Sequence, residues 1–171
     1  MERSQIISAF AALGEILEAL AKDQPRPLTC TEAEWEALQQ LIEREQHHNG
    51  WFTPDAIKMA FQEIAPWLSN VQLNNWLATY SYAEVPKTIA LILPGNLPLV
   101  GFHDLLSTLI AGHTAVVKLS SKDTILMKYV IESLIETVFK FMFFPSICPR
   151  FGSLTIIARI TASKIPATPK M

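Results

Sequence analysis

Two polar side chains stand at the ends of two apolar segments, where their chemistry could be used. Thr88 to Leu93 is an apolar run of strand length, and Thr114 to Leu119 is a second run rich in β-branched residues. Asn96 follows the first run, and its amide could donate a hydrogen bond to a developing oxyanion, which is worth about 3 kcal/mol. Lys118 stands near the end of the second run, and its ammonium could hold ribose hydroxyls or a phosphate. Because ligands bind beyond the carboxyl ends of strands in open α/β sheets, the pair predicts a binding site there.

The segments around these runs predict the frame that positions the two side chains. Leu99 to Ile110 is long enough for a helix, and Gly112 is placed to close it. Strand, helix and strand then form one right-handed crossover unit. Continuous apolar runs suit strands buried on both faces, as in parallel sheets. A further helix is predicted from about Thr124 through Val138.

The first half of the chain is predicted to be helical. An apolar stripe at helical spacing runs from Ile6 to Leu20, before a Pro-rich linker. Three more helices are predicted from N-cap patterns, which are Thr31 with Glu34, Thr53 before Pro54, and Ser69 with Gln72. Gly50 suits the exit of the second helix. The glutamates of that helix are interpreted as a solvated face: Glu32, Glu34, Glu36, Glu43 and Glu45.

Structural interpretations compete with the chemical ones for each candidate residue. Asparagine is favoured in turns and at helix caps, and local chemistry alone favours that use of Asn96. Lys118 could equally be a solvated strand end. His103 and Asp104 are left out of catalysis, since the helix dipole accounts for the aspartate and the histidine is more often packed or exposed. Neither GxGxxG nor GxxxxGK[ST] occurs.

The sequence supports no metal site. His47 and His48 are adjacent, so on a helix they would project about 100° apart and make a poor pair of ligands.

Length, charge and cysteine content limit the classes of protein to which this chain can belong. The chain has 171 residues, half of them hydrophobic, which suits one domain with a real core. The net charge of −2 gives no reason to expect nucleic acid as a partner. Two distant cysteines and the absence of a signal pattern favour a cytoplasmic protein. No window of eighteen or more uninterrupted apolar residues occurs, so the sequence predicts no transmembrane span.

Two motifs resemble those of a known family. "PGNLP" followed by "LIAGHTAVVKLSSKD" resembles the start of the cofactor-binding domain of aldehyde dehydrogenases. More closely, "NGWFTPDAIKMAF" and "ILPGNLPLVGFHDLLSTLIAGHTAVVKLSSKD" resemble the LuxC-type acyl-CoA reductases of that superfamily, over about residues 51–135. The resemblance implies an α/β fold, with a helical segment at 1–85 and the start of a Rossmann-like, parallel-sheet domain at 86–138.

The resemblance also implies a reaction and a set of site residues. A thiolate attacks a fatty acyl-CoA, and NADPH then reduces the acyl-enzyme thioester to an aldehyde. Asn96 would donate to the oxyanion, and Lys118 would bind the adenosine ribose of the cofactor. Ser120 and Lys122 would lie near the 2′-phosphate, although this chain has Lys-Leu-Ser where the family has Lys-Pro-Ser. Other substrates of the superfamily, acyl phosphates or free aldehydes, stay open, as does a non-catalytic binding fragment.

The chain departs from the family toward its end. The family's nucleophilic cysteine and its second, glycine-containing cofactor motif are missing, and neither Cys30 nor Cys148 stands in a matching context. Residues 137–171 hold five basic residues and no acidic one, and residues 139–171 form an atypical tail rich in Phe and Pro. A frameshift or truncation would give such a tail, and we therefore expect an inactive fragment. A genuine tail that contacts another subunit or, less favoured, a membrane is the alternative, and homo-oligomers stay open.

Overall fold

Helix starts follow the capping signals of the sequence. The computed structural model describes residues 3–139 and 155–156. The Thr31 hydroxyl accepts a hydrogen bond from the Glu34 N–H at 3.3 Å, while the Glu34 carboxylate accepts from the Thr31 N–H at 2.7 Å, which confirms the capping box. Thr53 and Ser69 cap the next two α-helices. The helices are α1 Arg3–Ala21, α2 Glu32–Glu45, α3 Pro54–Ile64, the 3₁₀ helix η1 Ala65–Leu68, α4 Asn70–Leu77, α5 Phe102–Ile110 and α6 Leu126–Phe139.

The second half contains the predicted crossover. Strands β1 Thr88–Ile92 and β2 Thr114–Lys118 pair in parallel, with Thr88 opposite Thr114 and Ile92 opposite Lys118. Helix α5 joins them and Gly112 ends it with φ +92, so the strand, helix and strand are confirmed. The predicted mixed α/β class is confirmed in this general sense.

Helix α5 begins later than the sequence suggested. The predicted start at Leu99 is wrong, because Leu99 has φ +56 and the helix begins at Phe102 with Gly101 as its N-cap. Asn96 is therefore not a helix cap, and of the two structural interpretations only the turn is left. Gly50 also does not end α2, since that helix ends at Glu45.

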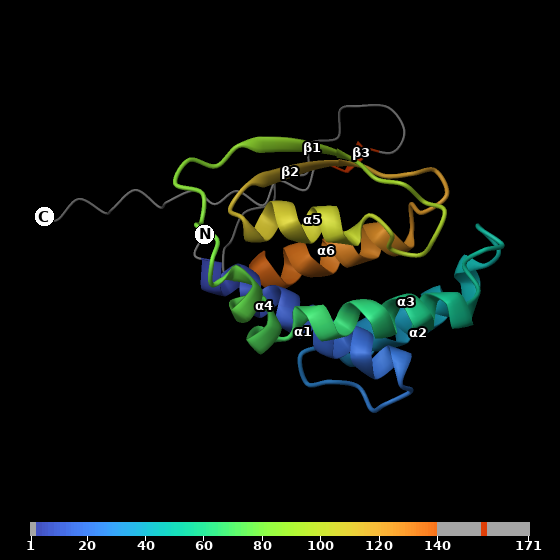
Figure 1. The fold of residues 1–171 in the computed structure, drawn as a ribbon. Coiled ribbons are helices and arrows are strands. Elements are labelled where there is room, and N and C mark those ends of the chain that lie inside the picture. The colour runs from blue at the N-terminus through green and yellow to red at the C-terminus, as the bar shows by residue number, and fades with distance from the viewer. Residues whose placement is uncertain (1–2, 140–154, 157–171) are drawn as a thin grey trace, which may run out of the picture.

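The helices lie on one side of the sheet. Figure 1 shows α5 and α6 directly below β1 and β2, with α1 to α4 as a further layer beneath them. Helix α1 packs against both α5 and α6, and the Phe10 ring meets the Phe102 ring edge-on at 6.1 Å. The buried residues of both halves form one continuous hydrophobic cluster. The helical first half is thus the support on which the α/β half rests.

Burial of β1 on both faces was predicted and is wrong. Thr88, Ala90 and Ile92 are exposed, and Ile92 is 78% accessible, whereas Ile89 and Leu91 are partly buried. Strand β1 is at the edge of a sheet with the order β1-β2-β3, and among the described residues helices cover only one face. Strand β2, in the middle, is mostly buried.

The end of the chain is described only in part. Strand β3 Thr155–Ile156 pairs antiparallel with the end of β2. The other residues beyond 139, to which the prediction of an atypical basic tail applies, lie outside the described residues.

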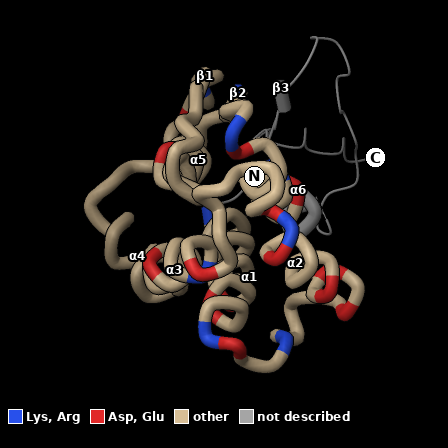
Figure 2. The backbone as a smooth tube through the Cα atoms, turned by 90° about the vertical axis from the view of Figure 1, so that its right-hand side faces the viewer, with Lys and Arg blue, Asp and Glu red and all other residues tan. Residues whose placement is uncertain are grey.

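Charged residues of both signs occur over the helices, and one helix, α1, is markedly apolar. Figure 2 shows acidic and basic residues interspersed over the helices. Helix α1 is long and apolar enough to cross a membrane by length and composition alone, but a buried core helix meets the same criteria. Ten residues of α1 are buried inside this structure.

Phe10→Ala tests whether the two halves unfold together. Removing a fully buried ring from the contact between α1 and α5 is expected to lower the free energy of unfolding by about 3 to 5 kcal/mol. Because the core is shared, tryptophan fluorescence and far-UV circular dichroism should report a single, coincident transition in urea. Val71→Ala, at an exposed position of α4, is the control and should change little. Separate transitions would instead support a domain boundary near residue 85.

Candidate functional site

Two loops meet at the carboxyl edge of the parallel strands. We call residues 93–101 the β1 loop and residues 119–125 the β2 loop. The Leu93 N–H donates to the Lys118 carbonyl at 3.0 Å, so pairing continues one residue beyond β1. Gly95 then lies against Ser120: a Cβ on the glycine would stand 2.5 Å from the Ser120 Oγ and 2.6 Å from its Cβ. Only a residue without a side chain lets the two loops approach this closely.

The predicted site residues lie on these two loops and on the adjoining strand end. Asn96, Lys118 and Lys122 are exposed, and Ser120 is partly buried. The Ser120 Oγ accepts from the Lys122 N–H at 3.2 Å, which fixes the turn after β2. The register places Lys118 opposite Ile92, the last residue of β1. The structure thus brings the segments that carry all four residues to one edge, while their individual roles stay predictions.

A third segment supports this edge from below. The Asn49 side chain donates to the Lys122 carbonyl at 3.0 Å and accepts from the Trp51 N–H at 3.1 Å. Asn49 belongs to the connection between α2 and α3. The helical first half therefore holds the β2 loop directly, through a polar contact as well as through the core.

Asp123 is a site residue that the sequence analysis did not identify. Its side chain is 1% exposed, and its two oxygens accept from the Leu99 N–H at 3.3 Å and the Met127 N–H at 3.1 Å. It thereby ties the β1 loop to the first turn of α6. Burial raises the pKa of Asp123 to about 6, against the opposing effect of the two N–H donors. The only signal in the sequence was an aspartate just before a predicted helix.

Glu45 faces the same interior region from the end of α2. The interpretation of Glu45 as part of a solvated helix face is wrong, because it is 2% exposed. Burial, together with the Asp123 carboxylate, raises the pKa of Glu45 to about 7. Two carboxyl groups, one from each half of the chain, are therefore buried behind the carboxyl edge.

No cysteine is found at this edge among the described residues. Cys30 is buried in the connection between α1 and α2, which Figure 1 shows on the far side of the helical layer from the sheet. Its carbonyl accepts from the Arg26 guanidinium. Cys148 lies outside the described residues. Within the described part of the chain no group of His, Cys, Asp or Glu residues is arranged to hold a metal ion.

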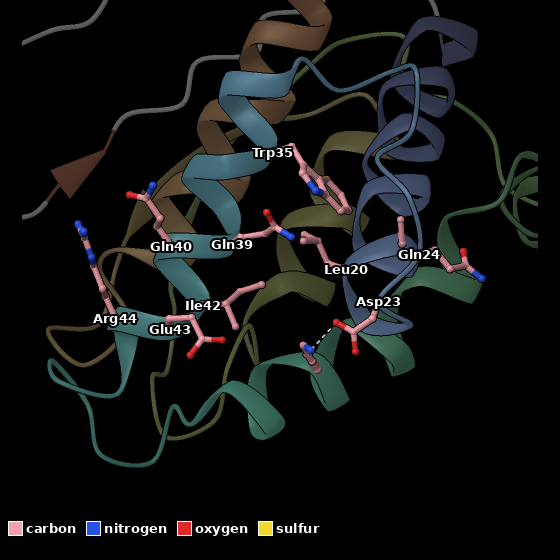
Figure 3. Close-up of a pocket in the computed structure, with 11 residues that line it drawn as sticks. Leu20, Asp23, Gln24, Trp35, Gln39, Gln40, Ile42, Glu43 and Arg44 are labelled. Carbon is pink, nitrogen blue, oxygen red and sulfur yellow. Dashed lines mark hydrogen bonds and ion pairs between the residues drawn. The ribbon is translucent and has the colours of Figure 1, made fainter.

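Two hollows lie elsewhere on the surface. Figure 3 shows the first, about 390 Å³, between α1, α2 and α3. Lys58 pairs with Asp23 at 2.6 Å at one end of it, and Trp35 lies at the other end. The second, about 490 Å³, lies between η1, α4 and α5. There the His103 ring is 6.1 Å from both the Trp67 and Trp76 rings, centroid to centroid. Neither hollow is lined by a predicted site residue, so the candidate site is the open edge and not a closed pocket.

Comparison with known proteins gives no match: no family model, no curated protein and no solved structure is similar to this chain.

Gly95→Ala tests the close approach of the two loops. The new methyl group would overlap Ser120, so the β1 loop must move or strain, at an expected cost of about 1 to 3 kcal/mol in the free energy of unfolding. Gly50→Ala is the matched control, because nothing lies within 4 Å of the Cβ it would add. Urea denaturation of both variants measures the difference. Equal stabilities would show that the loops are not in contact.

The burial of Glu45 predicts a pH dependence of stability. Its pKa rises from 4.5 to about 7 on folding, so the folded chain keeps a proton that the unfolded chain releases. This stabilisation is fully present below about pH 4.5 and is lost as the pH rises through about 7. The free energy of unfolding of the wild type, relative to Glu45→Gln, is expected to fall by about 1 to 3 kcal/mol over that range. Glu43→Gln, at an exposed position of α2, should follow the wild type at every pH.

Proposed function

We propose that this chain binds NADPH at the carboxyl edge and forms the opening part of a fatty acyl-CoA reductase of the aldehyde dehydrogenase type. The observation that carries the proposal is the contact of Gly95 with Ser120. It brings together two separated motifs, Pro-Gly-Asn and Val-Lys-Leu-Ser-Ser-Lys, on whose order and spacing the resemblance rests. The two strands pair in parallel, and in open α/β sheets the carboxyl edge of such strands is where ligands usually bind, which supports the proposal.

The residues at the edge fit the parts of the cofactor. Lys118 extends into solvent at the end of β2, where an ammonium can donate to both hydroxyls of a ribose. Lys122, four residues after Lys118, is also exposed. Its positive charge would balance the negative charge of a nearby phosphate. Ser120 contributes a hydroxyl between them. NADPH, when bound, supplies a hydride, and the chain's own part is to hold the nucleotide against this edge.

Asn96 has the exposure and the chemistry of an oxyanion donor. Its side chain is exposed on the β1 loop, and the turn that holds it is anchored by Leu99 through Asp123. An exposed amide on this anchored loop can donate to the negative oxygen that forms when a thioester carbonyl is attacked. The hydrogen bond from such a donor is stronger in the transition state than in the ground state.

The full reaction requires a thiolate that the described residues do not provide. The thiolate would displace CoA from the acyl group, and hydride addition to the resulting thioester would release the aldehyde and restore the thiolate. Cys30 is buried on the wrong side of the helical layer for this step. We therefore expect nucleotide binding without turnover from these residues alone.

A reductase acting on acyl phosphates, or a dehydrogenase acting on aldehydes, would use the same edge. These alternatives share the oxyanion donor and the cofactor lysine and differ in the leaving group. A substrate panel on the full-length gene product separates them. A non-catalytic binding or assembly module would not require the edge to bind a nicotinamide cofactor.

Lys118→Ala tests the cofactor assignment. Loss of hydrogen bonds from a charged donor is expected to weaken NADPH binding about tenfold or more in a fluorescence titration. Lys87→Ala is the control, because Lys87 is exposed just before β1, at the opposite end of the sheet. If Lys118→Ala and the wild type bind NADPH with equal affinity, the ribose contact is wrong.

A further inference from the structure

The hollow between η1, α4 and α5 combines aromatic walls with two polar side chains. We call it the aromatic hollow. Its volume of about 490 Å³ lies within the range of small-molecule sites, which enclose roughly 300 to 1,000 Å³. None of its lining residues belongs to the β1 loop or the β2 loop, so it is separate from the proposed cofactor edge. The lining residues are Pro66, Trp67, Gln72, Trp76, His103 and Leu106.

Three aromatic rings line this hollow. The His103 ring meets the Trp67 ring at an interplanar angle of 87° and the Trp76 ring at 39°, and both centroid distances are 6.1 Å. Neither contact is a parallel stack. Trp67 and Trp76 keep 48% and 39% of their surface exposed, so part of each indole is available to a ligand. A flat aromatic ring packs favourably on such a surface.

Buried neighbours hold the walls of the hollow in place. Leu68 in η1 and Leu73 in α4 have no exposed surface. The 3₁₀ helix η1 lies so close to α1 that a Cβ on Gly14 would stand 2.8 Å from the Leu68 Cβ. Among the lining residues only Leu106 of α5 is buried, and it forms the base of the hollow. Walls fixed in this way need little ordering when a ligand binds, which favours affinity.

The lining limits the charge of the ligand. Among the described residues no Asp, Glu, Lys or Arg lines the aromatic hollow, so an ion would lose hydration there without an opposite charge in its place. The first hollow differs, because Lys58 and Asp23 line it and pair with each other. In the aromatic hollow the Gln72 amide can both donate and accept a hydrogen bond, as can the neutral imidazole of His103. These groups match an uncharged ligand that carries a donor and an acceptor.

We propose that the aromatic hollow is a binding site for an uncharged, planar aromatic molecule. The ligand's ring system packs on the indoles of Trp67 and Trp76 and removes their exposed apolar surface from water, which favours binding. Gln72 and His103 hydrogen-bond its polar groups and thereby fix its orientation. The hollow contains no residue of the carboxyl edge, so this inference does not depend on the function proposed for that edge.

Matched probes test the shape and charge of the ligand. The bicyclic lactam carbostyril is flat and uncharged, with one N–H donor and one carbonyl acceptor. Its fully hydrogenated analogue keeps the lactam but is not flat, and tetramethylammonium is a cation. In a ligand-observed NMR titration of the wild-type chain, carbostyril is expected to bind about tenfold more tightly than either. Equal or tighter binding of the hydrogenated lactam or of the cation would overturn the proposal, as would no binding of carbostyril at millimolar concentration.

Substitutions in the hollow test which side chains hold the probe. Trp67→Ala and Trp76→Ala should each raise the dissociation constant of carbostyril about tenfold, and Trp76→Phe, which keeps a ring, should raise it less. Gln72→Ala should raise it about fivefold through the lost hydrogen bond. Trp51→Ala is the control and should leave it unchanged, because Trp51 is 78% exposed and does not line the hollow. An equal effect of Trp51→Ala would contradict the assignment.

The wild-type chain also shows where the probe binds, without any substitution. In two-dimensional proton–nitrogen NMR spectra, carbostyril should shift the indole N–H signals of Trp67 and Trp76 and leave those of Trp35 and Trp51 in place. Trp35 lines the first hollow, so a shift of its signal alone would place the probe there and overturn the inference.

Discussion

The parallel pairing of β1 with β2 is the constraint on which the rest of the structure depends. Parallel neighbours cannot be joined by a tight turn, so the chain must cross over through α5. A right-handed crossover places that helix on one face of the sheet, and α6 follows on the same face. The apolar side of these two helices then requires a cover, which α1 supplies with ten buried residues. The helical first half is in this sense a consequence of the sheet.

The same pairing creates the candidate site and the strain beside it. Both strands end at one edge, so two loops must share the space beyond it, and they can do so only because Gly95 has no side chain to meet Ser120. Leu99 turns the chain toward α5 with a positive φ, and its N–H is held by Asp123. A residue in that conformation is retained only where its surroundings determine it. The buried carboxylate is thus a structural requirement of the loop that carries Asn96.

The sequence predicted what is determined locally and missed what is determined by distant contacts. Thr31 with Glu34 could be identified as a capping box because both partners lie within one turn of helix. Glu45, in contrast, lies on a helix whose other glutamates are largely solvated, so nothing in the pattern of the helix itself marks it as the buried one. The exposure of β1 has a similar origin. An apolar run indicates a strand, but the number of covered faces depends on how many layers pack on the sheet.

The candidate site shows this limit in a single segment. Pro-Gly-Asn after an apolar run predicted a turn at the carboxyl edge, and the structure contains one. The role of Gly95 in that turn could not be predicted, because it is set by Ser120, 25 residues later. Asn96 and Lys118 stand exposed at an edge whose geometry is fixed from behind by Asp123 and Asn49, while Cys30 is buried beyond the helical layer. In the function that we propose, such an edge holds a nucleotide before any covalent chemistry occurs. Under the proposed function, binding and bond-making are separable, because the described residues place candidate cofactor contacts at the edge and no cysteine there.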